Sequence, residues 1–148
     1  MNFRPLTVVD IDSVMALEQS LPDSLSWKSA TMKEQLPIVE RGNEYGVFEN
    51  DVLIGKVGFE LSPEHEWHVD GLIVMNAYRG KEYGTRLFDY ALKQFTEKAH
   101  PKSLVLFVYP ENSPATSLYL RNGFIIKEWI ANKYGEGKHR LKMIKTVQ

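Results

Sequence analysis

The spacing of apolar residues is helical at the start of the chain and changes to strand-like further on. A short run at residues 3–6 predicts a strand. Thr7, followed three positions later by the acidic Asp10, forms a capping-box pattern that marks the beginning of a helix. Apolar residues then recur on one face of that helix: Ile11, Val14 and Leu17.

A second helix is predicted at residues 26–36, after a loop at residues 21–26. Its apolar spacing is weaker than that of the first helix. Pro37 is predicted to end it, because the residue before a proline is disfavoured in the helical conformation.

The middle of the chain has strand character. Residues 45–49 and 52–61 are separated by Asn50-Asp51, a turn pair that predicts a hairpin. A further strand is predicted at residues 67–75. Gly71 interrupts it, and an isolated glycine within a strand often marks a bulge or the close approach of another backbone.

Helical spacing returns after this strand. A helix is predicted to begin near Gly84 and to end before Pro101. Its apolar stripe consists of Leu87, Ala91 and Phe95. The near-continuous apolar run at residues 104–109 is typical of a buried central strand.

A short helix is predicted at residues 115–121, with Ser113 as its N-cap and Pro114 in its first turn. Asn122-Gly123 is a C-cap pair that ends it. Two strands complete the chain, at residues 124–131 and 139–147.

The interleaving of strands and helices predicts an α+β (mixed α/β) fold, with a parallel element where strand, helix and strand follow in sequence. The chain has 148 residues, the size of one domain with one core. No repeat, low-complexity tract or linker is visible. We therefore expect a single domain over residues 1–148.

Composition and charge exclude several classes of function. The net charge of −1 provides no basic field for nucleic acid, and no polybasic cluster indicates a membrane surface. The chain has no cysteine, which excludes disulfides and thiolate chemistry and fits a reducing compartment. No apolar run approaches the ~20 residues of a membrane span, and the N-terminus lacks the apolar segment of a signal peptide. We expect a cytoplasmic monomer or homodimer with no nucleic-acid or membrane partner.

Candidate chemistry is concentrated in the turn Arg79-Gly80-Lys81, between the strand that ends near Val74 and the following helix. Backbone N–H groups of residues 80–85, the helix dipole and two cationic side chains can converge on a phosphate or pyrophosphate. A plain connection with a basic, solvated loop accounts for the local spacing equally well. The P-loop and the dinucleotide-binding fingerprint are excluded, because their glycine spacing is missing.

A second motif distinguishes these interpretations. Residues 112–124 read NSPATSLYLRNGF, and the turn at residues 79–85 reads RGKEYGT. Together with the strand at residues 72–74, they resemble the GNAT superfamily of N-acetyltransferases, whose patterns are [RQ]-x-x-G-x-[GA] and N-x-x-A-x-x-L-Y-x-x-x-G-F. The second pattern is complete, whereas Glu82 replaces the middle glycine of the first. The order of elements matches the family over nearly the whole chain.

The resemblance implies a mixed, twisted, mostly antiparallel central sheet of about seven strands flanked by about four helices, with a splay between strands four and five. It also implies acetyl-CoA as the acetyl donor. The strand backbone at Leu72, Ile73 and Val74 would pair with the pantetheine arm, and Asn112 would hydrogen-bond to the cofactor. The turn would hold the pyrophosphate through Arg79, Gly80, Lys81, Glu82, Tyr83, Gly84 and Thr85.

Glu82 raises a separate question about the turn, since glutamate reaches positive φ only at a steric cost. A regular helical conformation would accommodate it. Its carboxylate is expected to point to solvent, because the backbone N–H groups are the donors.

The implied reaction is direct attack of a primary amine on the thioester in a ternary complex. Tyr119 would lie near the thioester sulfur and is the candidate proton donor to the leaving thiolate, although its ring could instead anchor the short helix. His68 and Asp70 share one face of the fourth strand and are the candidate bases. Some family members that acetylate ribosomal protein N-termini use a glutamate on the fifth strand, where this chain has Phe107.

Other signals are weaker. The run His65-Glu66-Trp67-His68 lacks the H-E-x-x-H spacing and a third ligand, so we expect no metal. The loop at residues 132–138 could cover the acceptor site or be a plain hairpin connection. The acceptor is expected to be a small-molecule or peptide amine. An acyl-CoA-binding module without turnover, or an interaction domain whose turn binds nothing, would also fit the sequence.

Overall fold

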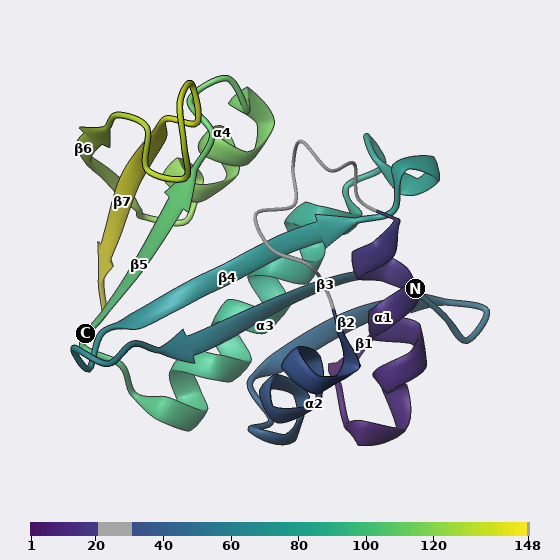
Figure 1. Cartoon of the computed structure of the whole chain (residues 1–148). Coiled ribbons are helices and arrows are strands. Elements are labelled where there is room, and N and C mark those ends of the chain that lie inside the picture. The colour runs from purple at the N-terminus through teal and green to yellow at the C-terminus, as the bar shows by residue number, and fades with distance from the viewer. Residues whose placement is uncertain (21–30, 148) are drawn as a thin grey trace. The chain divides into compact units, whose positions relative to one another are not determined.

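The computed structural model describes residues 1–20 and 31–147, which form a mixed α+β fold built on a seven-stranded sheet (Figure 1). The strands are β1 (Asn2–Pro5), β2 (Glu44–Glu49), β3 (Val52–Leu61), β4 (Trp67–Val74), β5 (Ser103–Val108), β6 (Ile125–Ile130) and β7 (Arg140–Thr146). The helices of the described residues are α1 (Ile11–Gln19), α2 (Met32–Glu40), α3 (Tyr83–Ala99) and α4 (Ser113–Arg121). Short 3₁₀ turns lie at Val8–Asp10 and Asn76–Tyr78.

The sheet has the strand order β1-β2-β3-β4-β5-β7-β6. The pairs β1–β2, β2–β3, β5–β7 and β6–β7 are antiparallel, whereas β4 and β5 are parallel. Trp67 pairs with Leu104 and His68 with Val105, so the ladder joins the beginnings of the two parallel strands. The predicted α+β fold class and the predicted order of elements are confirmed.

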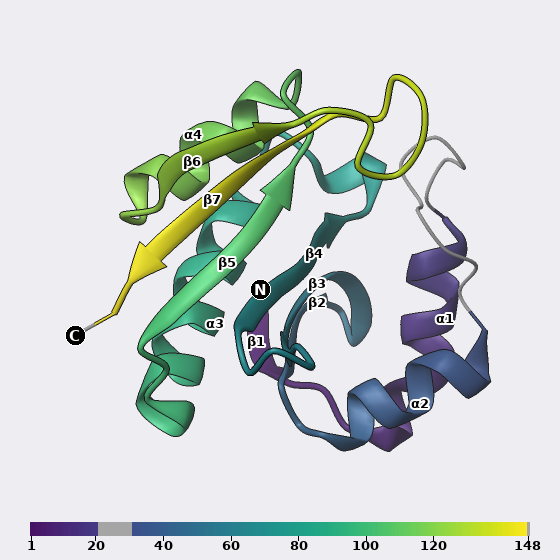
Figure 2. The ribbon, with the colours of Figure 1, turned by 60° about the vertical axis from the view of Figure 1, so that its left-hand side comes forward.

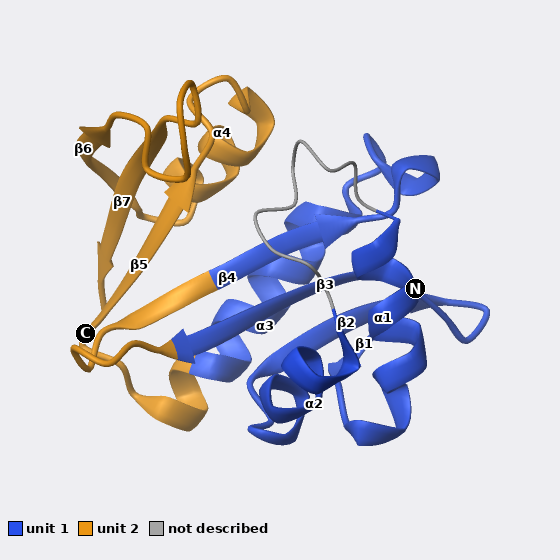
Figure 3. Ribbon diagram, viewed as in Figure 1, with its two compact units in different colours: residues 1–60, 70–95 blue, residues 61–69, 96–148 orange. Residues whose placement is uncertain are grey.

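Contacts within the chain define two compact units, which we describe separately (Figure 3). Unit 1 consists of Met1–Glu60 and Asp70–Phe95, and unit 2 of Leu61–Val69 and Thr96–Gln148. β4 and α3 each contribute residues to both units. The expectation of a single domain stays a prediction.

The sheet of unit 1 is covered on both faces (Figure 2). On the face of α1 and α2, a buried cluster consists of Leu6, Val14, Leu17, Val39, Phe48, Leu53 and Ile73. On the face of α3, Phe59 stacks on Phe95 with a centroid separation of 4.1 Å. Burial of large apolar side chains on both faces is the main stabilising contribution to this unit.

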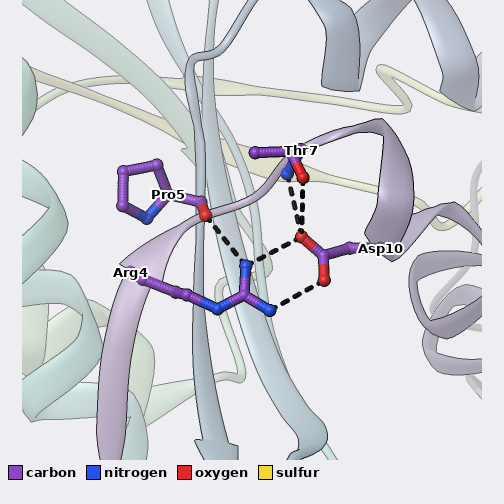
Figure 4. Close-up of polar contacts among 4 residues, drawn as sticks. All are labelled: Arg4, Pro5, Thr7 and Asp10. Carbon is purple, nitrogen blue, oxygen red and sulfur yellow. Dashed lines mark hydrogen bonds and ion pairs between the residues drawn. The ribbon is translucent and has the colours of Figure 1, made fainter.

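The capping box predicted at Thr7 and Asp10 is present and extends to Arg4 (Figure 4). The Thr7 backbone N donates to Asp10 Oδ2 at 2.9 Å. The two terminal nitrogens of Arg4 donate to the two Asp10 oxygens at 2.9 and 2.8 Å. The hydrogen bond from Arg4, opposed by burial, lowers the pKa of the Asp10 carboxyl. Strand β1 and the beginning of α1 are therefore held by one charge-assisted pair.

A second ionic cluster is buried between α1 and the sheet. Lys56 on β3 lies 2.8 Å from Glu44 Oε2 on β2 and 2.8 Å from Glu18 Oε1 on α1. Burial acts to lower the pKa of Lys56, but the two carboxylates outweigh it and raise that pKa. This cluster ties α1 to the centre of unit 1.

The prediction for the second helix was wrong at its end. Residues 21–30, which include the predicted loop and helix start, lie outside the described residues. Helix α2 has Thr31 as its N-cap, which accepts from Glu34 N at 3.2 Å, and it continues through Pro37. Gln35 and Val39, on either side of the proline, are both buried. Packing of this face therefore outweighs the missing N–H of Pro37.

Unit 2 contains a three-stranded sheet of β5, β7 and β6, with α4 on one face (Figure 2). Lys145 on β7 donates to the Asn122 carbonyl at the end of α4 at 2.6 Å, which identifies the face that α4 covers. The predicted C-cap at Asn122-Gly123 is present, since Gly123 has φ +89°. The N-cap of α4 is Asn112 and not the predicted Ser113.

Strand β6 lies at the end of the sheet order and is mostly exposed. Its exposed apolar side chains are Ile125, Ile126 and Trp129. The pairing with β7 shifts register between Ile126 and Glu128, which leaves Lys127 without an opposite residue.

Candidate active site

The turn between β4 and α3 has a backbone that only some residues adopt easily. Gly80 has φ +75° and Glu82 has φ +67°, with Lys81 between them. The expectation of a regular helical conformation at Glu82 was therefore wrong: this glutamate takes the left-handed conformation that glycine adopts more easily. Its side chain is exposed, as expected. The backbone at this position therefore has a positive φ, as a glycine there would allow, although the residue is a glutamate.

The same turn provides a cradle of backbone donors. Alternation of left-handed Gly80 and Glu82 with their neighbours points successive N–H groups outward as an anion-binding nest. Helix α3 begins at Tyr83, so the first N–H groups of the helix, including those of Gly84 and Thr85, have no partner within it. A Cβ added at Gly80 would meet no atom of the described residues within 4 Å. The predicted pyrophosphate-binding residues therefore come together on one side of unit 1.

The side chain of Arg79 serves the turn itself. Its Nε donates to the Val74 carbonyl at 3.1 Å, which ties the turn to the end of β4. Lys81 is exposed and has no such contact among the described residues. Lys81 is therefore the turn cation that is left to approach a ligand.

The end of β4 packs closely against the beginning of α3. The Met75 N–H donates to Ile54 O on β3 at 2.8 Å, and Ile73 belongs to the core of unit 1. A Cβ built at Gly84 would lie 3.5 Å from Val74 and 3.9 Å from Leu72, both ordinary contact distances. The strand that should pair with the pantetheine arm is thus held in place from both sides.

Gly71 marks an interruption of β4, as predicted, because its φ is +56°. The close backbone approach offered as one explanation is not present, since a Cβ there would meet nothing within 4 Å in the described chain. Asp70, which precedes it, is partly buried.

Two predicted cofactor residues lie at the two ends of α4. Asn112 caps the helix, because its Oδ1 accepts from Ala115 N at 3.2 Å. Tyr119 is buried, and its ring lies 6.0 Å from that of Phe124. Burial raises the pKa of the Tyr119 hydroxyl to about 12. The phenol therefore stays protonated at neutral pH.

His68 lies at the beginning of β4 in unit 2. Its ring centroid is 5.8 Å from that of Phe107 on β5. Its Nε2 atom is buried and has no hydrogen-bond partner among the described residues, and Glu66 Oε1 lies 3.5 Å away. A ring nitrogen with no donor beside it can accept a proton, which fits the role of a base.

Around Phe107 lies an aromatic–cationic cluster that the sequence analysis did not identify; it consists of Phe107, Tyr109, Lys133, Tyr134 and Arg140. Lys133 Nζ is 4.0 Å from the ring centroid of Phe107. Arg140 Cζ is 3.7 Å from the ring of Tyr109 and 4.9 Å from that of Tyr134. In the sequence, only the alternation of Phe107 on β5 with Tyr109, just after that strand, indicated the cluster.

The loop at residues 132–138 packs onto the strands and is more than a plain hairpin connection. Asn132 organises the loop, because its Oδ1 accepts from Gly137 N at 2.8 Å and its own N donates to His139 Nδ1 at 3.0 Å. Lys133 and Tyr134 extend from it into the aromatic–cationic cluster.

No group of three or more His, Cys, Asp or Glu residues is placed to hold a metal ion within residues 1–20 and 31–147. No helix in that same part of the chain has the length and apolarity needed to cross a membrane.

Comparison with known proteins gives one family. Residues 12–124 match the model of the acetyltransferase (GNAT) family, which is more than half of the chain. No curated protein sequence matches the chain significantly.

Solved structures of acetyltransferases have the same fold. A chain of the NatC complex bound to Gag peptide and CoA superposes with a TM-score of 0.84 at 19% identity, covering 99% of this chain and 98% of that one. The ribosomal-protein-alanine N-acetyltransferase from Brucella melitensis gives 0.86 at 15% identity, covering 99% and 100%. The PaiA N-acetyltransferase from Thermoplasma acidophilum, in complex with coenzyme A, gives 0.77 at 19% identity, covering 99% and 98%.

Proposed function

Because this chain belongs to the acetyltransferase (GNAT) family, we propose that its left-handed turn at residues 79–85 holds the pyrophosphate of acetyl-CoA. The protein is an acetyl-CoA-dependent N-acetyltransferase. The observation that carries the proposal is the φ of +67° at Glu82, because the turn keeps the backbone of the family motif where the motif glycine is missing.

The proposed reaction transfers the acetyl group directly to a primary amine. The ammonium, whose ordinary pKa is near ~10.4 for a lysine-like amine, first gives one proton to a base. The neutral nitrogen then forms a bond to the thioester carbon, and the resulting oxyanion accepts a hydrogen bond from a backbone N–H of β4. The C–S bond breaks, CoA leaves as a thiolate, and the second amine proton is transferred to that sulfur.

We assign the transfer of the second proton to Tyr119. Its pKa of about 12 lies above the roughly 8.5 of an ordinary thiol. The phenol therefore gives its proton to sulfur only as the amine proton replaces it on the same oxygen.

For the base we propose His68, with Asp70 as the second candidate on β4. The Nε2 atom of His68, which has no hydrogen-bond partner among the described residues, supports this choice, because a base needs a lone pair that no donor of the protein occupies. We propose that the pantetheine arm pairs with β4 at Leu72 to Val74 and that Asn112 hydrogen-bonds the cofactor. The acceptor is an amine, either a small molecule or a peptide.

Calorimetric titration of acetyl-CoA, followed by turnover assays with a panel of amines, tests the proposal. We expect binding and acetyl transfer, and we expect His68→Ala to lower turnover while acetyl-CoA affinity stays near wild type. Binding without transfer to any amine would instead identify an acyl-CoA-binding module. Absence of binding would overturn the assignment of the turn, and full activity of both His68→Ala and Asp70→Ala would overturn the assignment of the base.

A further inference from the structure

Arg140 is a buried cation with an unusual environment. It is 7% exposed and lies at the beginning of β7. Its guanidinium stacks on the ring of Tyr109 at 3.7 Å and faces that of Tyr134 at 4.9 Å. Two aromatic rings stabilise a buried guanidinium by cation–π contact, but they do not use the N–H donors at its edge.

That edge has few protein partners. Nη1 donates to the His139 carbonyl at 2.8 Å. Within residues 1–20 and 31–147, no carboxylate forms an ion pair with Arg140. Since a guanidinium has five N–H donors and a buried charge is costly without an opposite charge, this group is suited to binding an anion.

A second cation lies in the same cluster. Lys133 Nζ is 4.0 Å from the Phe107 ring and 5.3 Å from that of Tyr134, which Arg140 also contacts. Lys133 too has no ion-pair partner in the described part of the chain. Two cations that share one aromatic ring, with no carboxylate of residues 1–20 or 31–147 paired to either, create a positive potential on this face.

Lys142 is a less suitable member of this site. It lies opposite Phe107 on one side and opposite Glu128 on the other. The neighbouring carboxylate offsets its charge, so the inference rests on Arg140 and Lys133 alone.

The cluster lies on the same side of the sheet as the proposed base. His68 pairs with Val105, and side chains two apart along a strand share a face, so Val105, Phe107 and Tyr109 form one row. The ring of His68 is 5.8 Å from that of Phe107. Tyr109, with Arg140 over its ring, lies just past the end of β5 and follows Phe107 by about 7 Å in the strand direction. Lys145, which contacts α4, lies on the opposite face of β7 from Arg140.

We propose that Arg140 and Lys133 bind a carboxylate of the acceptor, so that the substrate is an amine that also carries an acidic group. The proposal rests on the proposed function, in which the amine is deprotonated at His68. An anion held beside Tyr109 and Tyr134 would place the amine of a short acceptor near Phe107. The carboxylate belongs either to a free amino acid or to an acidic residue near a peptide N-terminus.

Direct binding of a carboxylate without an amine tests this site. Glutarate and its neutral counterpart glutaramide are titrated calorimetrically into the protein, with and without saturating CoA. We expect glutarate to bind and glutaramide not to bind. Arg140→Gln should weaken glutarate by roughly tenfold or more, and Lys133→Gln by a few-fold, since a charge-assisted hydrogen bond is lost in each. Lys138→Gln, which removes an exposed charge from the same loop, is the matched control and should bind as wild type does.

Turnover then distinguishes the two sources of the carboxylate. Amino acids are compared with their amides, and peptides with Asp at the second position are compared with peptides that have Asn there. In the pair that represents the true acceptor class, the acidic compound should have a lower KM than its neutral counterpart. This difference in KM should disappear in Lys133→Gln.

The outcomes separate this inference from the proposed function and from a purely structural role. Equal binding of glutarate and glutaramide, or unchanged glutarate affinity in both variants, overturns the inference whether or not CoA binds. If Arg140 only anchors the two tyrosines, Arg140→Gln lowers Tm and Lys133→Gln leaves the acid preference intact, which also overturns it. Lys133 is a loop residue, so its variant tests the site even where Arg140→Gln does not fold.

Discussion

The turn at residues 79–85 in unit 1 and the aromatic–cationic cluster in unit 2 are built in different ways. The turn is made of backbone: two left-handed residues and the first N–H groups of α3. The cluster is made of side chains from β5, β7 and the loop at residues 132–138. A backbone site tolerates a change of residue that keeps its φ, whereas a side-chain site depends on the identity of each residue. The proposed cofactor and acceptor sites should therefore respond differently to substitution.

The largest effect is expected where a single side-chain atom does the chemistry. Tyr119→Phe removes one hydroxyl and keeps the ring, so packing against Phe124 should persist. General acid catalysis is worth about 10²–10⁴-fold. We expect kcat to fall by at least roughly tenfold, a smaller loss than this range allows, because a water molecule can replace the hydroxyl in part. Steady-state kinetics measure this. Affinity for acetyl-CoA, which depends on the backbone turn, should not change.

The pH dependence of the unfolding free energy provides a control for the Tyr119→Phe variant. Burial raises the pKa of Tyr119 from 10.0 to about 12, so the folded protein keeps this proton where the unfolded chain loses it. The free energy of unfolding should fall between about pH 10 and pH 12, by about 2–3 kcal/mol from this group. In denaturant titrations, the unfolding free energy of Tyr119→Phe should not show the part of this fall that comes from the tyrosine. Unchanged kcat, or a collapse of stability at neutral pH, would identify Tyr119 as an anchor.

An intermediate effect is expected from strain in the turn. Gly80→Val places a β-branched residue at φ +75°, a conformation that such residues rarely adopt. We expect acetyl-CoA affinity to fall by about tenfold, because strain of roughly 1–2 kcal/mol displaces the N–H donors. Gly137→Val has the same strain at φ +77° within the loop of unit 2, and it should leave that affinity unchanged. Equal losses in both variants would mean that the turn is not the site.

The smallest effect is an improvement. Glu82→Gly should relieve left-handed strain and remove a negative charge beside the proposed pyrophosphate. We expect a gain of about 1 kcal/mol in unfolding free energy and a few-fold gain in acetyl-CoA affinity at low salt. Glu82→Gln removes the charge and keeps the strain, so comparing the two by calorimetry separates the causes. A weaker affinity in Glu82→Gly would contradict the proposed role of the turn.

Features set by neighbouring residues could be predicted from the sequence, whereas features imposed by the tertiary structure could not. The order of elements, the capping box at Thr7 and the turn at Arg79 follow from local spacing, and local spacing is what a sequence displays. The conformation of Glu82 could not be predicted in this way, because the β4–α3 connection imposes a φ that glutamate itself disfavours. Helix α2 continues through Pro37 for a similar reason, since tertiary packing of Val39 outweighs a local preference.

The aromatic–cationic cluster was missed for a different reason. Tyr109 and Arg140 are far apart in the chain and meet only because β5 and β7 pair in a particular register. Apart from the alternation of Tyr109 with Phe107, nothing in the neighbouring sequence indicates that these residues meet. Such a site is found only once strand pairing is known.

The edge strand β6 has a consequence for how the protein behaves when it is concentrated. An exposed edge that carries Ile125, Ile126 and Trp129 would ordinarily recruit the edges of other molecules into a growing sheet. The register shift at Lys127 makes this strand irregular, and Lys127 adds an exposed charge to it; both features disfavour pairing with another edge. We expect deletion of Lys127 to straighten this edge and to make the protein more prone to aggregate.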